Sequence, residues 1–141
     1  MIEYIIEKGA KIVVCNGSIT AFDYLESGKR MHLVPYILSL GYPIEYATDA
    51  AQSAVRNSDY ETLAILLDNG FDINNRKKTV VNATGDTLIA EAGMFSDEKM
   101  IHYLLERGAD PNIPSLTKKL PFEMALKLGK PKNALLLRGE R

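Results

Sequence analysis

The segment Ile101-His102-Tyr103-Leu104-Leu105-Glu106-Arg107-Gly108 places apolar residues at helical spacing, then two charged residues and a glycine. This spacing predicts an amphipathic helix, and glycine supplies the left-handed residue that commonly ends one. The pattern occurs three more times, in Ile2–Gly9, Leu33–Gly41 and Leu63–Gly70. The four terminal glycines are 32, 29 and 38 residues apart, a mean of 33. The sequence therefore predicts an internal repeat with this period.

A shorter helix is expected before each long one, in the stretches Thr20–Leu25, Asp49–Val55, Thr87–Ala92 and Leu120–Leu126. Thr20, Asp49 and Thr87 are candidate N-caps, because their side chains can accept a hydrogen bond from a free helical amide. Pro121 suits the first position of a helix. Each unit is thus a short helix, a tight turn, a longer helix, a glycine and a projecting loop.

The loops after the glycines also repeat, as Asp72 and Asn74 in one copy and Asp110 and Asn112 in the next. Such side chains can bond nearby backbone and hold a turn. The longest loop, Phe71–Asp86, contains Arg76-Lys77-Lys78 followed by Thr79-Val80-Val81-Asn82. Its alternation of Thr and Val favours a short hairpin with a basic tip.

Two stretches carry a resemblance to a known family. Gly85–Ala92 is similar to G-x-T-P-L-H-x-A, and Leu104–Asn112 is similar to L-L-x-x-G-A-D-x-N. At this period, the chain resembles the ankyrin-repeat family. The resemblance implies an all-α solenoid of stacked helix-turn-helix units with projecting β-hairpin-like loops. The expected organisation is one domain with a partial repeat at 1–15, repeats at about 16–45, 46–80 and 81–115, and a C-terminal capping repeat at 116–141.

The chain departs from the family pattern in that the T-P-L-H tetrapeptide is nowhere intact. Its histidine, which usually forms a hydrogen bond between repeats, is replaced by Asp23, Gln52, Ala90 and Glu123 in turn. Pro35 is tolerated if its helix begins near Met31 or His32, because it then lies in the first turn. The expected core consists of Leu33, Ile37, Leu38, Leu63, Leu66, Leu67, Ile101, Leu104, Leu105, Leu135 and Leu136.

The composition is that of one globular domain: 141 residues, 46% hydrophobic and 25% charged, with a net charge of -1. The single cysteine excludes an internal disulfide and suits a reducing compartment. No apolar run approaches the roughly 18 residues that a membrane span needs. Two early glutamates, Glu3 and Glu7, do not fit a signal peptide. A cytoplasmic protein without membrane attachment is therefore expected.

Groups that would support catalysis are sparse. His32, His102 and Cys15 provide no set of metal ligands at the usual spacing. No phosphate-binding glycine motif follows a predicted strand. We therefore expect no enzymatic activity, no cofactor and no metal. An open stack of helix pairs instead offers a concave surface, which suits binding of another protein.

The resemblance implies that partners meet the loop tips and the exposed ends of the short helices. The candidate partner-binding residues are Arg56, Asn57, Arg76, Lys77, Lys78, Met94, Phe95 and Lys127. The hypothesis is that Met94 and Phe95, flanked by the basic loop tip, form a hot spot for an acidic partner surface. The alternative is that Phe95 packs into its helix turn and the loop cations only interact with water.

Three other functions stay open. The chain could be an immunity or regulatory protein that inhibits a cognate toxin or enzyme, or a host-directed effector or adaptor. It could also bind nucleic acid through residues 116–141, which carry a net charge of +5 against -6 for the rest. The absence of aromatic residues interleaved with these lysines argues against nucleic acid. The sequence leaves the oligomeric state and the partner's identity open.

Overall fold

The computed structural model of the chain describes Phe22, Leu25 and residues 29–76, 78–79 and 82–139. Every regular element within these residues is helical, which confirms the all-α class. Two short 3-10 helices are present, η1 (Met31–Leu33) and η2 (Ile44–Ala47). The α-helices are α3 (Val34–Ser39), α4 (Thr48–Arg56), α5 (Tyr60–Asp68), α6 (Leu88–Phe95), α7 (Glu98–Glu106), α8 (Pro121–Lys127) and α9 (Pro131–Leu137).

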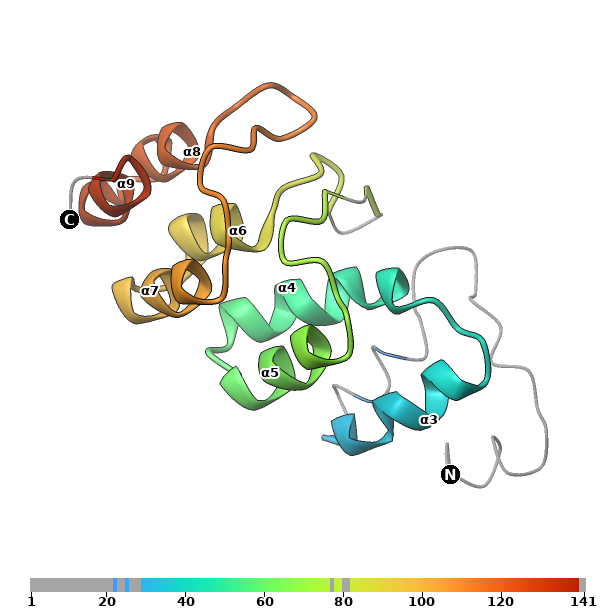
Figure 1. The fold of residues 1–141 in the computed structure, drawn as a ribbon. Helices are drawn as coiled ribbons and strands as arrows, with labels where there is room; N and C mark the ends of the chain where they lie inside the picture. The colour runs from blue at the N-terminus through green and yellow to red at the C-terminus, as the bar shows by residue number, and fades with distance from the viewer. Residues whose placement is uncertain (1–21, 23–24, 26–28, 77, 80–81, 140–141) are drawn as a thin grey trace.

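The helices form stacked pairs, α4 with α5, α6 with α7, and α8 with α9 (Figure 1). Helices α4, α6 and α8 contact one another in sequence and form an inner row. The expected difference in length within each pair is wrong for two pairs, because α4 and α5 both have nine residues and α8 and α9 both have seven. The loops before α6 and α8 project to one side of this row (Figure 1). The architecture is an ankyrin-type solenoid, as the repeat predicted. The exact repeat boundaries stay a prediction.

The core repeats with the sequence. Ala54, Ala92 and Ala125 occupy the same position in the three inner helices, and all three are fully buried. The residues nine positions after these alanines are also buried: Leu63, Ile101 and Ala134. So are the residues twelve positions after them: Leu66, Leu104 and Leu137. Small residues on the inner helices and larger ones on the outer helices therefore build one continuous core along the stack.

The same hydrogen bonds end equivalent helices. The Asp59 amide donates to the Ala54 carbonyl and the Lys130 amide to the Ala125 carbonyl, both at 2.9 Å. The outer helices α5 and α7 end in the same way. The Phe71 amide donates to the Leu66 carbonyl, and the Ala109 amide donates to the Leu104 carbonyl. Gly70 and Gly108 precede those amides at φ values of 95° and 96°, a conformation that favours glycine. The predicted glycine stops are confirmed in both helices.

Local predictions at the helix starts have mixed outcomes. Thr87 caps α6, since its side chain accepts a hydrogen bond from the Ala90 amide at 3.3 Å. Pro35 lies in the first turn of α3, and Pro121 is the first residue of α8. The prediction for Asp49 is wrong, because α4 begins one residue earlier and Ala47 takes the cap position. Thr20 lies outside the described residues.

The core prediction is wrong at Leu135, which is 45% exposed. Leu104 lies four residues before Gly108, and the same count back from Gly139 gives Leu135. Gly139, however, stands 14 residues after the buried Ala125, whereas Gly108 stands 16 after Ala92, so this count misplaces the buried face by about half a turn. The buried positions of α9 are Asn133, Ala134 and Leu137.

Helix α6 ends differently from α4 and α8. Its C-cap, Ser96, is extended at φ -126° and ψ -160°, so the left-handed turn is missing there. The buried side chain of Asn133 replaces it: its Nδ2 donates to the carbonyls of Gly93 and Ser96, each at 3.1 Å. The last repeat thus closes the end of the preceding inner helix.

Asn133→Ala is expected to destabilise the protein by about 1–3 kcal/mol, because it leaves two carbonyls at a buried helix end without this donor. Urea unfolding followed by circular dichroism measures the change. Lys132→Ala, at the exposed neighbouring position, is the control and should unfold as wild type does. Equal stability of Asn133→Ala and wild type would contradict this role for the amide.

Candidate functional site

The ends of the inner helices form a repeated surface feature, which we call the inner-helix row. It comprises two residues from each helix: Arg56 and Asn57 from α4, Met94 and Phe95 from α6, and Lys127 and Leu128 from α8. Each pair stands at the same distance from its buried alanine. Phe95 is 55% exposed and Leu128 46%, whereas Met94 is half-buried. Five of the eight residues predicted to bind a partner lie in this row.

Arg56 forms an ion pair within the protein. Its Nε lies 2.5 Å from Oε1 of Glu91, a buried carboxylate on the next inner helix. Burial raises the pKa of Glu91, an effect that the Arg56 charge opposes and the Asp86 charge reinforces. Part of the Arg56 charge is therefore already compensated. Glu91 was not among the predicted site residues. Its position on an inner helix that packs between two others could have indicated a buried carboxylate that needs a cationic partner.

The projecting loops are attached to one another. Arg76 donates from Nη1 to the Pro114 carbonyl at 2.8 Å, and the Asp110 amide donates to Oδ1 of Asn74 at 2.9 Å. The Leu116 amide donates to the Thr84 carbonyl at 2.9 Å. The predicted Asx turns are present as well, at Asp72 and Asp110. These bonds connect consecutive loops across the boundary between repeats.

The tip of the long loop is described only in part. The Thr79 amide donates to the Asn82 carbonyl at 3.1 Å, a bond that fits a tight hairpin turn. Lys78 is exposed, and Lys77 lies outside the described residues, as do Val80 and Val81. No strand is assigned in the described part of this loop.

The structure does not bring the basic loop and the apolar pair together. The Arg76 carbonyl lies against Gly85, before α6 begins, whereas Phe95 is the last residue of α6. Eight helical residues span about 12 Å, which places the two at opposite ends of the inner helix. The expected position of the basic tip beside Met94 and Phe95 is therefore wrong.

A buried polar network fixes the base of the long loop. Gln52, at the position of the family histidine, donates from Nε2 to the Asp86 carbonyl of the next repeat at 2.9 Å. Asn82 accepts from the Asp86 amide at 2.9 Å, and Thr79 donates to Asp49 at 2.6 Å. The bond between repeats that the sequence left open is thus formed here by glutamine.

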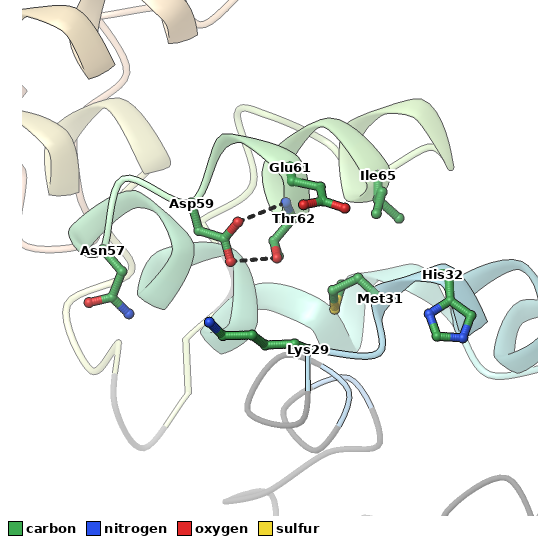
Figure 2. Close-up of a pocket in the computed structure, with 8 residues that line it drawn as sticks. All are labelled: Lys29, Met31, His32, Asn57, Asp59, Glu61, Thr62 and Ile65. Atoms are coloured by element: carbon green, nitrogen blue, oxygen red, sulfur yellow. Dashed lines mark hydrogen bonds between the residues drawn. The ribbon is translucent and has the colours of Figure 1, made fainter.

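A hollow of about 510 Å³ lies beside Asn57, between η1 and α5 (Figure 2). Its lining is mixed, with Lys29 and Glu61 beside Met31 and Ile65. The Asp59 carboxylate accepts from the Thr62 amide at 3.1 Å and its hydroxyl at 2.7 Å, so it caps α5 (Figure 2). The hollow adjoins the inner-helix row at Asn57, which is one of its lining residues.

Groups for metal chemistry do not gather in the part of the chain that the structure describes, where no three His, Cys, Asp or Glu side chains converge. His32 and His102 are both exposed, on η1 and α7. Cys15 lies outside the described residues. Among the described residues, no helix has the length and apolar character to cross a membrane.

Comparisons with known proteins support the fold. A fowlpox virus (strain NVSL) protein named as an ankyrin repeat protein, FPV242, is 27% identical over 111 residues, or 78% of this chain. The chain spans only 27% of that protein's length. No family model matches the chain.

A solved structure is similar as well. It is a complex of the predatory endopeptidase Bd0816 from Bdellovibrio bacteriovorus with the immunity protein Bd3460. A chain of it matches with a TM-score of 0.72 at 14% identity, over 99% of this chain and 73% of that one. The similarity to FPV242 confirms the resemblance to ankyrin-repeat proteins, and the solved structure shows that the chain has a known fold.

The Glu91 contribution to stability should fall as pH rises above the ordinary glutamate pKa of 4.5. A carboxyl whose pKa is raised on folding keeps its proton longer in the folded state, so ionisation favours unfolding. The expected result is that the unfolding free energy of wild type minus that of Glu91→Gln is smaller at neutral pH than at about pH 4. Urea titrations of both proteins measure it; a difference that grows with pH would contradict the raised pKa.

Proposed function

We propose that the protein is a non-enzymatic module that binds a partner protein through the inner-helix row and the loops at the other end of the same helices. The observation that carries this proposal is the exposure of Phe95 and Leu128 at equivalent positions of neighbouring inner helices. Aromatic side chains are enriched among residues that dominate binding energy. A large apolar side chain held in water at a repeated position is well placed to enter a partner's pocket.

The rigidity of the surface supports the same proposal. The buried Gln52 bond joins α4 to the base of the loop before α6, and the bonds of Arg76 and Asn74 join consecutive loops. A surface already fixed before binding loses little conformational entropy when a partner docks. The ends of the inner helices and the loops are therefore suited to forming one preorganised interface.

The partner is proposed to carry acidic groups. Lys127 is exposed in the inner-helix row and Lys78 is exposed in the long loop. Arg56 is exposed beside Asn57, although it also pairs with Glu91. Charges at the rim of an interface mainly set association rate and specificity. The location is proposed to be cytoplasmic, on the sequence composition alone.

An inhibitory role is a second candidate, because the solved complex named above pairs an immunity protein with an endopeptidase. For this chain, an immunity or regulatory role requires that the partner be an enzyme and that the inner-helix row cover it. Adding the protein in equimolar amount would then abolish that enzyme's activity. A partner without catalytic activity would favour an effector or adaptor instead.

Nucleic-acid binding is less well supported. Lys130 and Lys132 line a groove of about 400 Å³ together with Asp97 and Glu98. Carboxylates in the same groove repel phosphates and offset the lysines. A steep fall of affinity with salt concentration would nevertheless favour a nucleic acid over a protein partner.

Affinity capture with two variants tests the proposed interface. The double variant Met94→Ala/Phe95→Ala is expected to lose the partner that wild type retains, with affinity reduced at least about tenfold. Leu135→Ala removes a comparable exposed side chain from α9 and should retain the partner. Quantitative mass spectrometry of the captured proteins gives the readout. Full retention by the double variant would exclude the inner-helix row as the interface.

A further inference from the structure

In this structure, helix α8 exposes a face that the equivalent helices α4 and α6 bury. In α4 this face consists of Ala51, Gln52 and Val55, and in α6 of Ile89, Ala90 and Gly93, all of them buried. The equivalent residues of α8 are Phe122, Glu123 and Leu126. Phe122 is only half-buried, Glu123 is exposed, and Leu126 is 50% exposed. We call these three residues the α8 end face.

The internal repeats show what covers such a face. A Cβ added at Gly93 would lie 2.6 Å from Cδ1 of Leu137 and 3.6 Å from the Cβ of Ala125. Helices α8 and α9 therefore pack directly onto this face of α6. A helix is thus the element that fits the equivalent face of α8, where Leu126 replaces the glycine and adds a protruding apolar side chain.

The charges around the α8 end face have mostly one sign. The Arg138 guanidinium lies over the Phe122 ring, 5.4 Å from its centroid, and exposed Lys127 follows Leu126. The Glu123 carboxylate accepts a hydrogen bond from the Leu120 amide at 2.8 Å, so it is engaged within the protein.

From these observations we propose that the α8 end face docks an amphipathic helix with an apolar stripe and acidic borders. The apolar stripe would cover Phe122 and Leu126, and the acidic borders would meet Lys127 and Arg138. This interface shares Lys127 with the inner-helix row but has different apolar residues, Phe122 and Leu126 in place of Phe95 and Leu128.

Direct binding of a synthetic helix tests the proposal. The probe is a fluorescent peptide of about 18 residues with leucines along one stripe and glutamates beside it, compared with a peptide carrying lysines instead. Fluorescence anisotropy should show binding of the acidic peptide, weakened by added salt, and little binding of the basic one. Equal binding of both peptides, or of neither, would overturn the proposal.

Two variants locate the site. Leu126→Gln should weaken binding of the acidic peptide about tenfold, because the apolar contact is replaced by a polar one. Leu135→Gln changes a similarly exposed leucine on α9, outside the α8 end face, and should bind as wild type does. Phe95→Ala should leave peptide binding unchanged, which separates this site from the inner-helix row. An effect of Phe95→Ala without one of Leu126→Gln would place the peptide elsewhere.

Self-association is the competing occupant. Sedimentation over a range of protein concentrations should show that wild type and Leu126→Gln have the same state of association. A wild-type dimer that Leu126→Gln dissociates would assign the α8 end face to a second copy of the chain and overturn the acidic-helix proposal.

Discussion

Close approach of the inner helices is the constraint on which the structure depends. Ala54, Ala92 and Ala125 are fully buried where α4, α6 and α8 pass one another, and larger outer-helix residues fill the space behind them. A pair of helices cannot bury its own apolar side, so each repeat relies on its neighbours. A bulkier residue at any of these alanines would force two helices apart and shift the loops that project from them.

Polar contacts then convert a packed stack into a defined surface. Gln52, Asn133 and Arg76 each connect one repeat to the next, and each bond ends on a backbone carbonyl rather than on another side chain. Such contacts fix the position of one repeat relative to the next more narrowly than apolar packing alone. The residues of the inner-helix row have similarly fixed positions, because they lie at the ends of helices and not in loops.

The sequence predicted the features that repeat and missed those that occur once. The glycine stops, the Thr87 cap and the buried leucines of α5 and α7 follow from local periodicity, so they could be read directly. The buried face of α9 could not be predicted, because three consecutive leucines allow more than one buried face and Gly139 lies two residues nearer its buried alanine than Gly108 does. The Glu91 pair and the Asn133 bonds join residues more than 30 positions apart, and no local pattern specifies such pairs. The separation of Arg76 from Phe95 was missed because distance along the chain does not show which end of a helix a loop reaches.

Amide hydrogen exchange on the complex with a captured partner is the most direct test of the central claim. The account predicts that binding slows exchange at the carboxyl ends of α4, α6 and α8, around Asn57, Phe95 and Leu128, with little change in α5 and α7. Protection confined to the outer helices, with the ends of the inner helices unchanged, would contradict it.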